Sequence, residues 1–95
     1  MRLSFEIRPG LSPMDRGEVE DEIVGALGDD VDILGGGTLF GDEETVSDFQ
    51  VEIGEDRPVA DVVSACRRAV LPIPFELPTV ITLQIGAETV VLRDR

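Results

Sequence analysis

The chain has 95 residues, of which 20 are acidic and 8 are basic, so its formal net charge is −12. This excess of negative charge disfavours binding to nucleic acid or to an anionic membrane surface. The sequence contains no histidine, which excludes a Ser-His-Asp or Cys-His catalytic centre and removes the commonest zinc ligand.

Hydrophobic residues make up 42% of the chain, which is too much for a disordered acidic tail and indicates a packed core. A single cysteine excludes an intrachain disulfide. We find neither a signal-peptide pattern nor an apolar run long enough to span a bilayer. The expectation is therefore one cytoplasmic domain over residues 1–95.

The first predicted element is a half-buried strand over residues 2–8, because Leu3, Phe5 and Ile7 alternate with polar residues. A helix follows, with Ser12 as its N-cap and Pro13 at its first position. Its apolar stripe consists of Val19, Ile23, Val24 and Leu27, and Gly28 suits its C-terminal cap.

Residues 31–40 and 46–53 read as two strands joined by a polar turn. Pairing Phe40 with Thr45 would place Leu34 beside Val51 and Gly36 beside Phe49. The predicted core face then holds Leu34, Phe40, Phe49, Val51 and Ile53. The predicted outer face holds Ile33, Gly35, Gly37, Asp48, Gln50 and Glu52.

A second helix is expected after Asp56, which can cap it, with Pro58 in its first turn. Its apolar stripe comprises Val59, Val62, Val63, Cys66, Ala69 and Val70. The proline-rich residues 72–78 are expected to be extended. Residues 79–85 and 88–93 then form a hairpin through Gly86-Ala87.

The resulting order β-α-β-β-α-β with an appended strand is that of a ferredoxin-like α+β domain. We expect its two helices to cover one face of a mostly antiparallel sheet, leaving the other face open. The expected spatial order of the strands is 2-3-1-4-5.

Three patterns were considered as catalytic or metal sites. The stretch from Gly35 to Gln50 resembles the signature of minimal nucleotidyltransferases, which implies magnesium-binding carboxylates. Gly36, Gly37 and Asp48 match that signature, but Gln50 stands where the second carboxylate is needed. A calcium loop starting at residue 30 lacks ligands at two positions, and Cys66 lies on an apolar stripe. We therefore expect no enzyme activity, no metal and no cofactor.

Residues 17–56 contain 14 acids and no base. One interpretation is a solvated face that keeps the protein soluble. The other is a docking surface for a basic protein partner, as in an inhibitor or immunity-type protein. The candidate contact residues are Glu18, Asp21, Glu22, Asp42, Glu43, Glu44, Asp48, Gln50 and Glu52.

The layout of the chain, with its GGGTLFG and SDFQVEI segments, looks like small acidic proteins of bacterial toxin-immunity and conflict systems. That resemblance implies binding rather than catalysis. One alternative is a structural module that forms a homodimer through the open sheet face or an edge strand, and another is a relict minimal nucleotidyltransferase.

Overall fold

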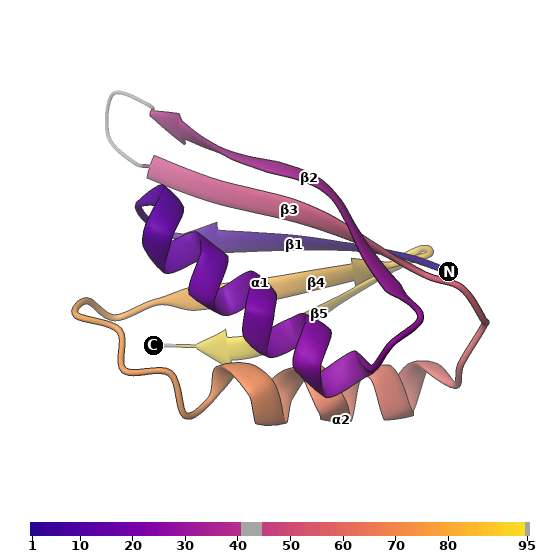
Figure 1. Ribbon diagram of the computed structural model, residues 1–95. Coiled ribbons are helices and arrows are strands. Elements are labelled where there is room, and N and C mark those ends of the chain that lie inside the picture. The colour runs from indigo at the N-terminus through magenta and orange to yellow at the C-terminus, as the bar shows by residue number, and fades with distance from the viewer. Residues whose placement is uncertain (41–44, 95) are drawn as a thin grey trace.

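The computed structural model of the chain is an α+β domain with two helices packed against an open, five-stranded sheet (Figure 1). The structure describes residues 1–40 and 45–94, except for the side chain of Phe40. The elements are β1 (Arg2–Arg8), α1 (Pro13–Leu27), β2 (Val31–Phe40), β3 (Thr45–Ile53), α2 (Val59–Val70), β4 (Val80–Ile85) and β5 (Glu88–Asp94).

The strands lie in the order β2-β3-β1-β4-β5, and each neighbouring pair is antiparallel. This is the order expected from the sequence. It makes β2 and β5 the two edge strands. The β4–β5 hairpin turns at Gly86-Ala87 as predicted, and Gly86 has the positive φ of 60° that a tight hairpin turn requires.

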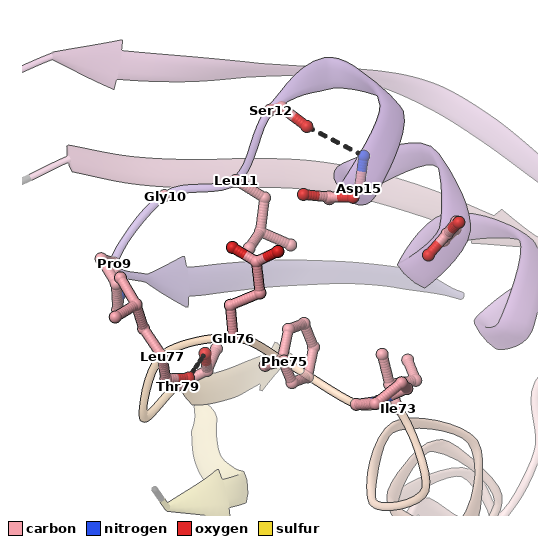
Figure 2. Close-up of a pocket in the computed structure, with 12 residues that line it drawn as sticks. Pro9, Gly10, Leu11, Ser12, Asp15, Ile73, Phe75, Glu76, Leu77 and Thr79 are labelled. Carbon is pink, nitrogen blue, oxygen red and sulfur yellow. Dashed lines mark hydrogen bonds between the residues drawn. The ribbon is translucent and has the colours of Figure 1, made fainter.

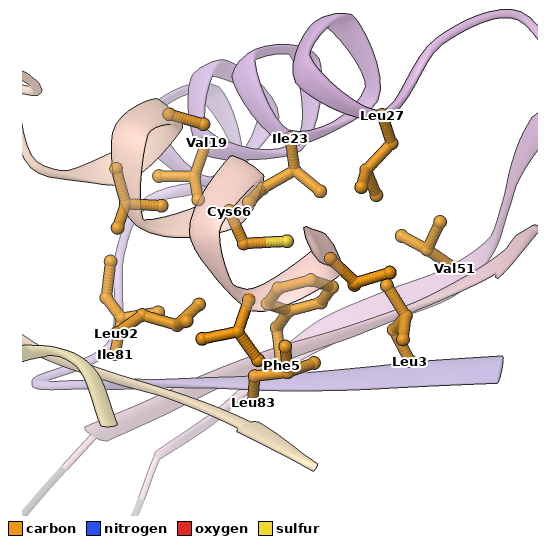
Figure 3. Packing of buried hydrophobic residues seen from close by; sticks show 14 of the residues in the cluster. Leu3, Phe5, Val19, Ile23, Leu27, Val51, Cys66, Ile81, Leu83 and Leu92 are labelled. Atoms are coloured by element: carbon orange, nitrogen blue, oxygen red, sulfur yellow. The ribbon is translucent and has the colours of Figure 1, made fainter. Parts of the chain in front are cut away.

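The core lies between the helices and one face of the sheet (Figure 3). The strict alternation of β1 is confirmed, because Leu3, Phe5 and Ile7 are all buried. Phe5 pairs with Phe49 across β1 and β3, and their rings stack with centroids 4.7 Å apart. Since neither Trp nor Tyr is present, this stack is the largest aromatic contact that the core contains.

Helix α1 starts where the sequence predicts. The Ser12 Oγ accepts a hydrogen bond from the Asp15 amide at 3.2 Å, and Gly28 closes the helix with φ of 106°. Its buried residues, Val19, Ile23 and Leu27, face the sheet.

Helix α2 buries most of its predicted stripe but begins differently. Pro58 occupies the N-cap, and no side chain caps the helix, so the predicted role of Asp56 was wrong. Val59 is 37% exposed because it stands in the first turn, at the margin of the core. Arg67 and Arg68 lie on the exposed side, as expected.

The predicted register of the β2–β3 hairpin holds only near its turn. Phe40 pairs with Thr45 and Gly36 with Phe49, but a bulge between Ile33 and Gly35 shifts the pairing. Ile33 rather than Leu34 then lies opposite Val51. A bulge inserts one unpaired residue and so reverses the faces beyond it.

That bulge overturns two face assignments. Leu34 was expected in the core but is 47% exposed, and Ile33 was expected on the outer face but pairs with the buried Val51. Phe40, also expected in the core, has its side chain outside the described residues.

The pairing of Gly36 with Phe49 depends on the absence of a side chain at Gly36. A Cβ there would lie 2.7 Å from the Asp48 carbonyl oxygen and 2.9 Å from the Phe49 Cβ. The Glu20 Oε1 of α1 would be 3.2 Å away on the same side. A Cβ at Gly37, which lies on the opposite face, would meet nothing within 4 Å.

A buried polar contact fixes the loop before α1 to this hairpin. The Ser47 Oγ accepts a hydrogen bond from the Leu11 amide at 2.7 Å and lies 2.8 Å from the Thr38 Oγ1. The Gly10 amide donates to the Thr45 carbonyl at 2.8 Å. These bonds satisfy the buried Ser47 and hold the start of α1 in place.

We expect Gly36→Ala to lower the free energy of unfolding by about 1–3 kcal/mol, because the added methyl group overlaps backbone that cannot move aside. Gly37→Ala is the matched control, and its effect should stay within about 0.5 kcal/mol. Urea unfolding of both variants measures the difference. Equal destabilisation by the two substitutions would contradict the close approach at Gly36.

Candidate functional site

The predicted contact residues do not form one surface. Glu18, Asp21 and Glu22 lie on α1, which covers the core face of the sheet (Figure 1). Asp48, Gln50 and Glu52 lie on β3 and point to the opposite, open face. Asp42, Glu43 and Glu44 lie outside the described residues.

On the helical side of the molecule, a groove runs between α1 on one side and α2 with the following residues 71–77 on the other. Three adjoining hollows of about 240, 420 and 350 Å³ share lining residues and run along it. Small residues of both helices form its floor at one end, namely Gly25, Ala26, Ala65 and Ala69. We call this surface the helical groove.

One wall of the helical groove is acidic. Asp15, Glu18, Asp21 and Glu22 lie at successive helical spacings on α1 and line its hollows. Among the described residues, none of these four carboxylates has an ion-pair partner, whereas Arg16 and Glu20 of the same helix pair with each other. Arg68 of α2 lines two of the same hollows, so the helical groove holds four carboxylates of α1 and one guanidinium, which leaves an excess of negative charge.

The helical groove ends in a cavity of about 240 Å³ next to the start of α1. Figure 2 shows Ile73, Phe75 and Glu76, from the segment after α2, facing Leu11 and Asp15. This cavity combines apolar side chains with the carboxylates of Asp15, Glu18 and Glu76. Leu77 also lines it and is 63% exposed, so apolar surface continues to its rim.

Arg93 of β5 fixes the segment that forms the wall of this cavity. Its Nη1 donates hydrogen bonds to the carbonyl oxygens of Val70, Leu71 and Ile73, at 2.8–3.1 Å. Its guanidinium also lies over the Phe75 ring, 4.6 Å from the centroid. One side chain thus closes the C-terminal end of α2 and positions two residues of the cavity.

The sequence predicted three residues of the helical groove, Glu18, Asp21 and Glu22, but did not predict the cavity. Asp15 and Glu76 fall outside the acid run of residues 17–56, and the proline-rich segment was read only as a connection. Its pattern of apolar residues around prolines, PIPFELP, was the available signal.

The open face carries a separate hollow of about 680 Å³. Asp48 and Gln50 line it from β3, together with Ser4 and Glu6 of β1. Gly35 and Gly37 form its side along β2, where the missing side chains leave space. We call this surface the sheet trough. Glu52 lies beyond it, ion-paired with Arg2 at 3.2 Å.

The sheet trough contains the residues that match the nucleotidyltransferase signature. Gly36 faces the core and Gly37 the open side, and Asp48 lies directly opposite Glu6. The signature requires a second carboxylate at the position of Gln50. Glu6 places a carboxylate next to Asp48 instead, but the Glu6 Oε1 is ion-paired with Arg8. No group of three or more metal-ligating side chains is found within residues 1–40 and 45–94.

Cys66 is fully buried in the core, among Val19, Ile23 and Phe5 (Figure 3). Desolvation raises the pKa of its thiol to about 12, so the thiolate that nucleophilic chemistry needs is disfavoured.

In the described part of the chain, neither helix is long and apolar enough to cross a membrane.

Comparison with protein-family models, with curated proteins and with solved structures finds no match to this chain.

We expect Arg93→Ala to lower the free energy of unfolding by about 1–3 kcal/mol, because three carbonyl contacts and the ring contact are lost together. It should also speed hydrogen exchange at the Ile73 and Phe75 amides, whose bonds lie in the same segment. Arg93→Lys keeps the charge but not the guanidinium geometry, so its free energy of unfolding and its exchange rates should lie between those of the wild type and Arg93→Ala. Unchanged exchange in Arg93→Ala would contradict the positioning role.

The raised pKa of Cys66 predicts alkaline destabilisation. The unfolded thiol ionises near its ordinary value of 9.0 and the folded thiol near 12, so stability is complete below pH 9 and falls as pH rises above it. Histidine, tyrosine and lysine are absent, so few other groups titrate in this range. Urea unfolding between pH 8 and 11 should show the decline in the wild type and a flatter profile in Cys66→Ala. Identical slopes would contradict the assignment.

Proposed function

We propose that this chain is a non-catalytic binding domain that docks on a basic protein partner through the helical groove. The single observation that carries the proposal is the row of four unpaired carboxylates on α1 beside an apolar floor and cavity. Such a surface complements a segment that carries arginine or lysine next to apolar side chains. An inhibitor or immunity-type protein that covers a basic partner surface fits this description.

The charge of the protein determines the sign of charge that its partner must carry and the rate at which the two proteins meet. With a net charge of −12, the protein attracts a basic surface over a distance that salt shortens. The cavity then accepts an apolar or cationic side chain between Phe75 and Leu11, where the carboxylates of Asp15 and Glu76 lie close by. The apolar contact supplies affinity, and the acidic wall supplies orientation.

The strand order β2-β3-β1-β4-β5, with a helix between β1 and β2 and another between β3 and β4, supports assignment to the ferredoxin-like plan. This plan leaves one sheet face free of helices. It does not by itself indicate a function.

Self-association is a second candidate, favoured by apolar side chains on the edge strand β2. Ile33, Leu34 and Leu39 are 42%, 47% and 69% exposed. Light scattering at increasing protein concentration tests this candidate. A dimer that persists when Leu34 and Leu39 are both changed to Ser would remove its basis.

The docking proposal predicts that an amphipathic helical peptide, with arginines on one side and leucines on the other, binds the helical groove. In an NMR titration, the shifted amides should be those of residues 11–22 and 73–77. The double variant Glu18→Gln, Glu22→Gln should weaken binding about tenfold, because two attractive charges are lost.

The matched control is Asp61→Asn, Glu88→Gln, which changes net charge equally on exposed residues outside the helical groove. Its affinity should stay near that of the wild type. If both double variants weaken binding alike, the peptide responds only to net charge and the groove assignment is wrong.

A further inference from the structure

The edge strand β2 presents backbone that nothing in the described part of the chain pairs. In the sheet order, β2 has β3 on one side only, and Figure 1 shows it along the rim of the sheet. An edge strand of this kind exposes a row of amide and carbonyl groups that can pair with another strand. The bulge near Leu34 limits the regular part to Gly35–Phe40, which is long enough for strand addition.

The two edges of the sheet differ in how they are covered. At β5, the Arg67 Nη2 of α2 donates a hydrogen bond to the Val91 carbonyl at 3.1 Å, so a helix side chain occupies part of that edge. The regular part of β2 carries neither proline nor a charged residue, and Leu39 is 69% exposed. Proline and charged side chains, which often block edge pairing, are thus absent from Gly35–Leu39, and the bulge of β2 lies before this segment.

Because Gly35 and Gly37 have no side chains, the space beside the edge of β2 is continuous with the sheet trough. A Cβ at Gly35 or Gly37 would meet nothing within 4 Å, and both residues line the hollow of about 680 Å³. A sixth strand beside β2 would lie about 10 Å from β3. An arginine or lysine side chain crossing Gly37 and the Asp48 side chain can together cover that distance.

The charges around this edge select the occupant. Asp48 is exposed and has no ion-pair partner among the described residues. Each copy of the chain carries a net charge of −12, so a second copy would approach this edge against charge repulsion. A basic extended segment meets opposite charge and keeps the backbone pairing.

We infer that β2 accepts an extended basic segment of a partner protein as a sixth strand, with an arginine or lysine side chain lying over Gly37 toward Asp48. This inference goes beyond docking in the helical groove, because it concerns the other side of the sheet. It stands whether or not the groove binds a peptide.

The probe is a decapeptide of alternating arginine and valine, titrated into the full chain and followed by NMR and hydrogen exchange. We expect new protection at the amides of Gly35–Leu39 and shifts at Asp48. N-methylation of every second backbone nitrogen on the pairing side removes the donors and should weaken binding at least tenfold. Equal affinity of the methylated peptide would overturn the inference, because charge alone would then explain binding.

Variants of the chain separate this surface from the helical groove. A Cβ at Gly37 would meet nothing within 4 Å, so Gly37→Val should keep its melting temperature and bind the peptide about tenfold more weakly. Asp48→Asn should weaken binding without altering the strand. Glu18→Gln, Glu22→Gln should leave the affinity unchanged.

Two further results would contradict the proposal. The first is equal weakening by the α1 double variant, which would place the decapeptide in the helical groove. The second is tighter binding of a peptide with the sequence of residues 32–39, which would assign the edge to a second copy of this chain.

Discussion

The other features of the molecule depend on the stacked pair Phe5–Phe49. Strand β2 pairs with Phe49 at Gly36, where there is no room for a side chain. The two rings are the largest buried side chains of a core that has no other aromatic pair among its described residues. Their pairing fixes the register of β1 against β3, and Gly36 fixes β2 against Phe49. Because side chains alternate along strands, these pairings determine which residues face outward.

The outward residues then divide the acidic charge between two surfaces. The acid run extends in sequence from Glu18 to Asp56, but α1 covers one face of the sheet, whereas the acidic side chains of β3 point from the opposite face. Carboxylates of α1 border the helical groove, and Asp48 with Glu6 borders the sheet trough. A run of charge in a sequence is therefore not evidence of one contact surface in an α+β fold.

Much of the fold was predictable because local signals were strong. The alternation in β1, the Ser12-Pro13 start of α1 and the Gly86-Ala87 turn each depend on a few adjacent residues. The strand order followed from the order of elements. These features use backbone rules that hold regardless of the tertiary context.

The features that were missed depend on contacts between distant segments. The bulge at Leu34 changes pairing by one residue and leaves the apolar pattern unchanged, so alternation alone could not locate it. The absence of a cap at Asp56 reflects where the chain enters α2. The cavity forms only because Arg93 holds residues 73–75 opposite Leu11 and Asp15, across most of the chain.

The division of charge between the two surfaces is the central claim, and paramagnetic relaxation measures it most directly. Amide relaxation caused by a small cationic nitroxide is compared, residue by residue, with that caused by its neutral counterpart, at low ionic strength. The cationic probe should be enriched at two separate places, along residues 15–22 of α1 and around Gly37 and Asp48. A single maximum, or uniform enrichment over the whole surface, would contradict the account.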